Sequence, residues 1–142
     1  MSGAQSPDEW LELSQHHRQA AAALAGNKAL ANQELFHIGL SVECALKAYI
    51  MHSQRMNSWP TKEERPDLWE HSTKKLALAA ALPLTAVPAL KPRLLTMFQW
   101  YRGSAYDPLP ITEKALQGYR DAAFGAGYGL VTWISAKLTK NP

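Results

Sequence analysis

Residues 41–51, SVECALKAYIM, restrict the fold of this chain more than any other stretch. The stretch is largely apolar but contains Glu43 and Lys47, two opposite charges that a helix would place one turn apart. The surrounding periodicity predicts a helix from about Leu30 to His52. One side of that helix carries Phe36, Leu40, Glu43, Lys47 and Ile50. A helix this apolar is stable in water only when other elements cover it.

The N-terminal stretch predicts an amphipathic helix ahead of this central one. Ser6 is a typical N-cap, Pro7 suits the first helical position, and Asp8 and Glu9 place acids in the first turn. An apolar stripe follows at spacings of three and four residues, formed by Trp10, Leu13, His17, Ala20 and Leu24. Residues 26–27, Gly-Asn, end this helix.

The remaining two thirds of the chain alternate between loops and shorter helices. Residues 53–70 are polar and contain two prolines, which predicts a loop. Residues 71–82 predict a short helix that Pro83 stops. A fourth helix carries Leu94, Leu95, Phe98 and Tyr101. Residues 103–112 form another loop, and a last helix is expected from Thr112 to about Leu138.

The pattern as a whole predicts an all-α fold, because no stretch alternates polar and apolar residues long enough to build a sheet. We expect an up-and-down bundle of about four to five helices with mostly antiparallel neighbours. At 142 residues, with 46% apolar and 19% charged residues, the chain is typical of a single globular domain over residues 1–142.

The last predicted helix carries small residues along one stripe. The stripe consists of Ile111, Ala115, Gly118, Ala122, Gly125, Gly129, Thr132 and Ala136. Small side chains would let another helix approach closely, which offsets part of the cost of glycine in a helix. A dimeric structural scaffold with its interface on this stripe is therefore one hypothesis. GAGYG, residues 125–129, is not a phosphate loop, because no strand precedes it and no Gly-Lys-Ser/Thr follows.

Charge and composition argue against a dedicated nucleic-acid-binding protein, a secreted protein and a membrane protein. The net charge is only +3, and the Lys and Arg residues are scattered, so the charge pattern is weak evidence for nucleic-acid binding. The N-terminus lacks the basic start and apolar stretch of a signal peptide, and no window of about 18 apolar residues exists. We expect no membrane association and a reducing, cytoplasmic location. The single cysteine, Cys44, cannot form an internal disulfide.

No metal or other cofactor is expected. The five histidines, at positions 16, 17, 37, 52 and 71, form neither HExxH nor the paired Glu-x-x-His pattern of di-iron bundles. His17, on an apolar stripe, is interpreted as a half-buried structural imidazole. Cys44 has His37 and Lys47 nearby, but apolar surroundings raise the pKa of a thiol, so core packing is the better interpretation.

Two polar features have both a structural and a functional interpretation. Glu43 and Lys47 are either a stabilising i,i+4 ion pair or one wall of a polar groove between helices. In WYRGSAYDP, residues 100–108, Arg102 either interacts with the preceding helix dipole or presents its planar donors to a phosphate or carboxylate. Tyr106 and Asp107 follow it directly.

Three segments resemble HEPN domains, the higher-eukaryote and prokaryote nucleotide-binding helical bundles. LSVECALKAYI is similar to the family's second-helix signature, and WEHSTKKLALAA is similar to a later helix that starts with His. WYRGSAYDP resembles the segment after the next long helix. The resemblance implies a helical bundle that commonly forms a dimer. Many family members are metal-independent ribonucleases, often toxins, while others are RNA-binding or partner modules.

The chain departs from the nuclease pattern, which has an Arg, four to six residues and then a His near the start of a late helix. No His follows Arg102, and tyrosine is a poor general base at neutral pH. Arg65 and His71 have the required spacing, but they lie in the predicted loop and at the start of the third helix. In a ribonuclease the His would move the 2′-OH proton and the Arg would stabilise charge on the phosphate.

The first hypothesis is a HEPN-like binding or regulatory module that is nucleotide- or RNA-related and lacks this ribonuclease pair. It would be a homodimer or pair with a nucleotidyltransferase-type protein, as in toxin–antitoxin systems. Its binding groove would comprise Glu43, Lys47, His71, Arg102, Tyr106 and Asp107. The second hypothesis is a metal-independent ribonuclease that uses Arg102 or Arg65 with His71.

Overall fold

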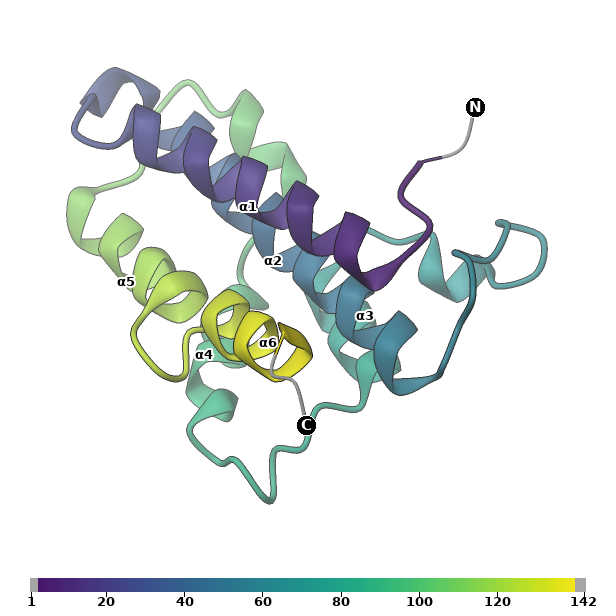
Figure 1. The fold of residues 1–142 in the computed structure, drawn as a ribbon. Coiled ribbons are helices and arrows are strands. Elements are labelled where there is room, and N and C mark those ends of the chain that lie inside the picture. The colour runs from purple at the N-terminus through teal and green to yellow at the C-terminus, as the bar shows by residue number, and fades with distance from the viewer. Residues whose placement is uncertain (1–2, 140–142) are drawn as a thin grey trace.

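The computed structural model describes residues 3–139, which contain six α-helices and no strand. The α-helices are α1 (Pro7–Leu24), α2 (Ala31–Ser53), α3 (Thr73–Ala80), α4 (Leu90–Met97), α5 (Glu113–Phe124) and α6 (Leu130–Thr139) (Figure 1). Three short 3₁₀ helices join them: η1 (Lys28–Leu30), η2 (Pro66–Leu68) and η3 (Arg102–Tyr106). The predicted all-α class is confirmed, with one helix more than expected.

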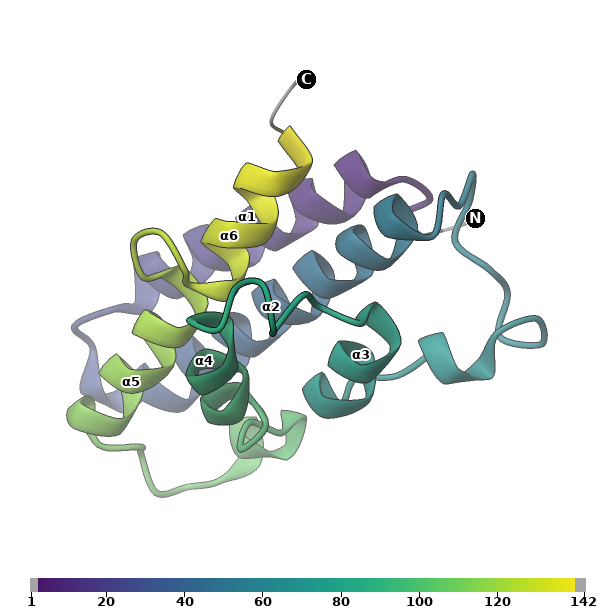
Figure 2. The same cartoon turned by 90° about the horizontal axis from the view of Figure 1, so that it is seen from below.

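Helix α2 is the central element. Sixteen of its 23 residues are buried, and α1, α3, α5, α6 and η3 all pack against it. Figures 1 and 2 show α3 toward the C-terminal end of α2 and α5 toward its N-terminal end. This arrangement covers the apolar stretch 41–51, as its composition requires.

Helices α1 and α2 form the tightest pair in the bundle, and small residues let them approach. Ser14 Oγ donates to the carbonyl of Ser41 at 2.7 Å, and Ser41 Oγ donates to the carbonyl of Ser14 at 2.8 Å. The predicted start of α1 is confirmed, because Ser6 Oγ accepts a hydrogen bond from the Glu9 N–H. Gly26, at φ +88°, turns the chain after α1.

The prediction of one long helix from Thr112 to Leu138 is wrong. Gly125 leaves the helical conformation with ψ 147°, Gly127 has φ +79°, and a new helix begins at Leu130. Three glycines within five residues favour this turn over a continuous helix. The stripe of small residues is therefore split between α5 and α6. A Cβ at Gly118 would meet nothing within 4 Å, so no helix packs closely there.

The other boundaries agree with the sequence more closely. The third predicted helix is α3, which starts after the N-cap Ser72. The fourth is shorter than expected, because α4 ends at Met97 and Tyr101 precedes η3. The loop at residues 53–70 is confirmed and includes η2.

Gly39, in the middle of α2, makes room for the indole ring of Trp100. A Cβ at this position would overlap three ring atoms of Trp100, and Trp100 itself is only 5% exposed. The indole Nε1 donates to the carbonyl of Leu35 at 2.9 Å, which holds the ring across α2. Glycine at position 39 thus determines how the segment after α4 docks on the bundle.

We predict that Gly39→Ala destabilises the fold by about 1–3 kcal/mol, since the added methyl must displace a packed indole. Gly118→Ala is the matched control, because its Cβ enters open space and alanine favours a helix interior by about 0.5–1 kcal/mol. Urea unfolding followed by circular dichroism at 222 nm measures both changes. Equal stability of the two variants would contradict the assigned packing.

Candidate functional site

The centre of the candidate site is the buried carboxylate of Glu43. Lys47 Nζ donates to Glu43 Oε2 at 2.9 Å, and both side chains are less than a tenth exposed. His71 Nδ1 lies 3.1 and 3.0 Å from the two oxygens of the same carboxylate. The structure thus brings together three of the predicted site residues, two from α2 and one from the approach to α3.

This geometry fixes the tautomer of His71. An ionised carboxylate only accepts hydrogen bonds, so the Nδ1 of His71 must carry a proton. The Nε2 atom then points away from Glu43, on a side chain that is about half exposed. A neutral His71 therefore offers Nε2 as a free acceptor to whatever approaches from solvent.

A cavity of about 430 Å³ opens beside these residues. We call it the Lys47 cavity. Its walls are Gly3, Ala4, Gln5, Trp10, Lys47, Trp59, Lys62, Trp69, Glu70 and His71. The Lys47 ammonium lies 5.0 Å from the ring centroid of Trp10 and 5.7 Å from that of Trp59. These indole faces and Glu43 together stabilise a cation that is almost fully buried.

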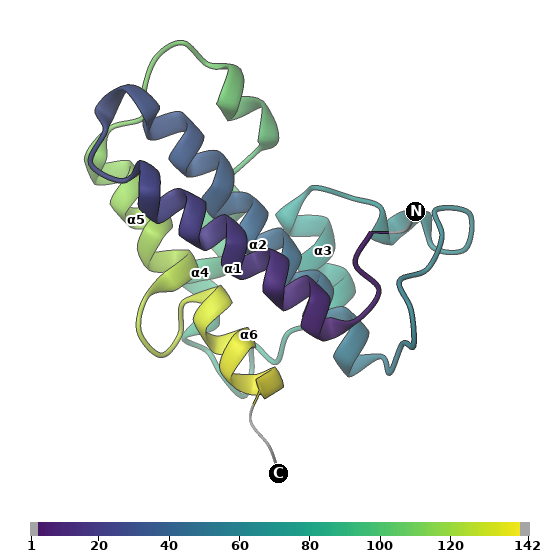
Figure 3. The ribbon, with the colours of Figure 1, turned by 45° about the horizontal axis from the view of Figure 1, so that its top comes forward.

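Long-range hydrogen bonds fix the loop that closes this cavity. The Trp59 N–H donates to Gln5 Oε1 at 3.0 Å, which joins the loop to the segment before α1. Trp69 Nε1 donates to the carbonyl of Pro60 at 2.8 Å, while its ring stays 51% exposed. Figure 3 shows this loop beside the N-terminal segment at one end of the molecule. The cavity therefore has one exposed aromatic face at its mouth.

Arg102 and Tyr106 lie elsewhere, so the predicted single groove is not formed. The Arg102 guanidinium carbon lies 5.9 Å from the ring centroid of Phe36. Phe36 precedes Glu43 by two turns of α2, about 10 Å along the helix axis. Tyr106 is 87% exposed. Placing these residues in the Glu43 groove was wrong because the segment after α4 docks on the N-terminal half of α2.

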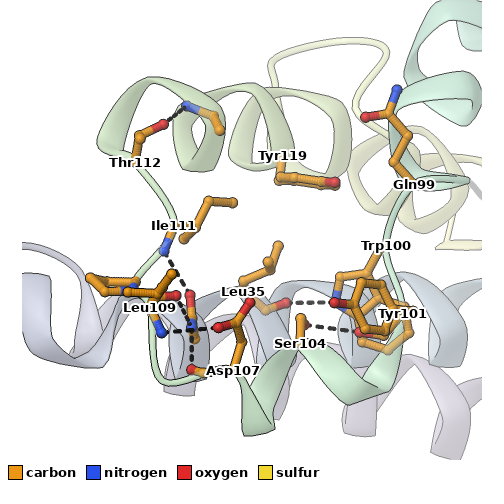
Figure 4. Close-up of a pocket in the computed structure, with 13 residues that line it drawn as sticks. Leu35, Gln99, Trp100, Tyr101, Ser104, Asp107, Leu109, Ile111, Thr112 and Tyr119 are labelled. Carbon is orange, nitrogen blue, oxygen red and sulfur yellow. Dashed lines mark hydrogen bonds between the residues drawn. The ribbon is translucent and has the colours of Figure 1, made fainter.

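Asp107 lines a second cavity, of about 440 Å³, between α2, residues 99–112 and α5 (Figure 4). We call it the Asp107 cavity. The Asn32 side chain holds its rim, since Asn32 Nδ2 donates to the carbonyls of Asp107 and Leu109, both at 2.9 Å. Asn32 Oδ1 accepts from the N–H of Ile111 at 2.8 Å. Asp107 Oδ1 accepts from the Leu109 N–H at 2.9 Å.

Arg65 does not lie with His71. Its guanidinium binds both carboxylate oxygens of Asp67, at 3.0 and 2.9 Å, and this hydrogen bonding raises the pKa of Arg65. Arg65 does not line the Lys47 cavity. The sequence spacing of Arg65 and His71 therefore does not correspond to a shared site.

Cys44 behaves as a structural residue, and the described residues offer no metal site. Cys44 is buried, and burial, with Glu43 as the next cause, raises the pKa of its thiol to about 12. Among residues 3–139, no group of three or more His, Cys, Asp or Glu side chains is arranged to hold a metal ion. The same residues contain no helix that is both long and apolar enough to span a membrane.

The sequence interpretation missed the aromatic walls of the Lys47 cavity. Trp59 and Trp69 lie in a stretch that is otherwise polar, and large aromatic residues in such a loop are an available signal for a buried or ligand-facing role. The sequence pattern placed Trp10 on the apolar stripe of the first helix, with no partner ring predicted for it. In the structure, its ring meets that of Trp59 edge-on, with centroids 5.2 Å apart.

Comparisons of the chain with models of known protein families, with curated proteins and with solved structures find no match. The resemblance to HEPN domains therefore rests on the three sequence segments alone.

A second polar contact joins α1 and α2 near this site. His17 Nδ1 and His37 Nδ1 are 3.0 Å apart, with ring centroids at 5.3 Å and an angle of 27° between the rings. One Nδ1 must therefore donate to the other, which requires at least one of them to be unprotonated. Burial lowers the pKa of both histidines, and the neighbouring His37 lowers that of His17 further. The pair is a neutral structural contact near pH 7.

We predict that this pair makes stability depend on pH. Because burial lowers the folded pKa values of both histidines below the ordinary value of about 6.5, the unfolded chain binds more protons than the folded one as pH falls through that region. The contribution is fully present above pH 6.5 and is lost as pH falls toward the folded pKa values. His17→Asn, which keeps a hydrogen-bonding group without titrating, should flatten the pH dependence of the unfolding free energy between pH 5 and 7.5. Exposed His52→Asn, at the far end of α2, should leave it as in the wild type, since His52 contributes to neither shift; identical slopes in all three proteins would contradict the assignment.

Proposed function

We propose that the protein is a HEPN-like binding or regulatory module whose Lys47 cavity binds a nucleotide or the end of an RNA strand. The observation that carries the proposal is the Lys47 ammonium in a cavity walled by three tryptophans. Aromatic side chains stack on nucleobases, and Lys and His side chains contact phosphates. A cavity of about 430 Å³ is also in the range that suits a small ligand.

The arrangement of the resembling segments supports this proposal. LSVECALKAYI lies in α2, and WEHSTKKLALAA comprises the four residues before α3 and the whole of α3. Their polar residues meet in one contact, between Glu43 and His71. The expected homodimer, the nucleotidyltransferase-type partner and a toxin–antitoxin role rest on the resemblance alone and belong to the same proposal.

The charges around the Lys47 cavity favour an anion. Glu43 is paired with Lys47, and Glu70 is paired with Lys75 at 3.3 Å. Lys62, also in the cavity wall, has no ion-pair partner among residues 3–139. The net charge of the lining is therefore positive.

We predict that adenosine 5′-monophosphate or a short single-stranded RNA quenches tryptophan fluorescence, with saturation. Trp69→Ala should weaken binding about tenfold or more, because loss of one stacking ring costs about 1–3 kcal/mol per base. Lys62→Ala should weaken binding by less and reduce its salt dependence. Both side chains are exposed and line the cavity. Because Trp69→Ala also removes the hydrogen bond to the Pro60 carbonyl, circular dichroism and a melting curve of each variant check that the fold is retained.

The matched control is Lys114→Ala, which removes an exposed cation on α5 outside the Lys47 cavity. It should bind like the wild type. Failure of both probes to bind, or unchanged affinity of Trp69→Ala, would refute the proposed site.

A second candidate function is metal-independent RNA cleavage at the same site, favoured by the Glu43–His71 contact. A buried carboxylate that orients a histidine is a common arrangement for a general base. His71 Nε2 would accept the 2′-OH proton, the 2′ oxygen would attack the adjacent phosphorus, and the bond to the 5′ oxygen would break as that oxygen takes a proton from water. Lys47 and Lys62 would stabilise the charge that develops on the phosphate.

This candidate predicts RNA cleavage in EDTA that His71→Ala abolishes. Arg65→Ala and Arg102→Ala should retain the activity, because neither guanidinium lies in the Lys47 cavity. Gel analysis of a labelled RNA, with detection of the 2′,3′-cyclic phosphate, measures the reaction. Equal cleavage by wild type and His71→Ala, or no cleavage by either, would exclude the catalytic function while leaving the binding function to its own test.

A further inference from the structure

The Asp107 cavity differs in chemistry from the Lys47 cavity. Among the residues that line it, Asp107 is the one charged side chain, and no Lys, Arg or His contributes. Its aromatic walls are Trp100, Tyr101 and Tyr119, and its apolar surface includes Leu35 and Ile111 (Figure 4). A site of this composition combines a large apolar surface with a single negative charge.

Hydrogen bonds hold the cavity open in its present shape. The Asn32 side chain fixes the backbone at Asp107, Leu109 and Ile111, as described above. On the opposite wall, Trp100 is fixed to the carbonyl of Leu35 and Ser104 Oγ donates to the carbonyl of Tyr101 at 2.9 Å. A ligand would therefore enter a site that is already formed, without the cost of ordering a loop.

Several polar groups of this cavity are free to bind a ligand. The side chains of Gln99, Tyr101 and Tyr119 have no hydrogen-bond partner among residues 3–139. Asp107 uses Oδ1 for the Leu109 N–H, and Oδ2 has no partner in the same part of the chain. The free groups are thus a carboxylate oxygen, two phenols and a side-chain amide.

The electrostatics of these groups favour a cation. Within residues 3–139, no cationic side chain lies over the ring of Tyr101 or Tyr119 or pairs with Asp107. Aromatic faces and a carboxylate are complementary to an organic ammonium group.

We propose that the Asp107 cavity binds a small organic amine with an apolar body. The body would lie against Leu35, Ile111 and the ring of Tyr119. The ammonium group would lie toward Asp107 Oδ2 and the tyrosine rings. This site is separate from the Lys47 cavity, and the proposal does not depend on the function proposed there.

A matched pair of probes tests the charge preference. Phenethylammonium and 3-phenylpropionate have similar apolar bodies and opposite charges, and each is titrated into ¹⁵N-labelled full-length protein. The reporters are the Asn32 side-chain amide and the Ile111 backbone amide, both at the rim of the cavity. We expect saturable shifts of these signals with phenethylammonium and none with 3-phenylpropionate at the same concentrations.

Variants then separate the contribution of the Asp107 charge to binding from that of the Tyr119 ring. Asp107→Asn keeps an acceptor for the Leu109 N–H and should weaken amine binding up to about fivefold, as for an exposed ion pair. Tyr119→Leu should weaken it further, because it removes an aromatic face. Asp121→Asn, which changes a carboxylate outside this cavity, should have no effect.

Three results would overturn the proposal. They are equal binding of the acid and the amine, unchanged affinity of both Asp107→Asn and Tyr119→Leu, and amine-induced shifts confined to the Lys47 cavity, as reported by the Trp69 indole N–H.

Discussion

The Glu43 carboxylate is the interaction on which the arrangement of the candidate site depends. It is buried in the central helix, and it accepts hydrogen bonds from Lys47 on the same helix and from His71 ahead of α3. One anion thus positions a lysine against two tryptophans and also fixes the point where α3 begins. Removing Glu43 would leave Lys47 buried without its counter-charge, which is costly for any fold. A simple ion pair on a surface helix has no such consequences.

Much of the fold could be predicted from the sequence because its signals are local. Ser6 and the residues after it define α1, and the periodicity of residues 30–52 defines α2. The break between α5 and α6 could not be predicted with the same argument. Its glycines are tolerable in a helix if a partner helix packs against them and favour a turn if none does. That choice depends on tertiary contacts, and within residues 3–139 no helix packs against Gly118.

The candidate site shows the same division between local and long-range information. The contact of Glu43 and Lys47 follows from their spacing, and the position of His71 was suggested by the resemblance to HEPN domains. The position of Arg102 could not be predicted, because it depends on how the segment after α4 docks on α2. That docking depends on Trp100 and Gly39. The tryptophan walls of the Lys47 cavity could not be predicted either, because they depend on where the loop at residues 53–70 folds. The position of that loop depends on its hydrogen bond to the N-terminal segment.

The bond between Gln5 and Trp59 has a practical consequence for work with this protein. Gly3, Ala4 and Gln5 form part of the wall of the Lys47 cavity, next to the exposed ring of Trp69. A peptide fused ahead of them would emerge beside the mouth of that cavity and could cover it or compete for its aromatic surface. Affinity tags are therefore better attached after α6, because its last residue, Thr139, lines a different hollow and no residue of α6 lines the Lys47 cavity. The same proximity makes a fluorophore attached at position 4, within the cavity wall, a direct reporter of ligand entry.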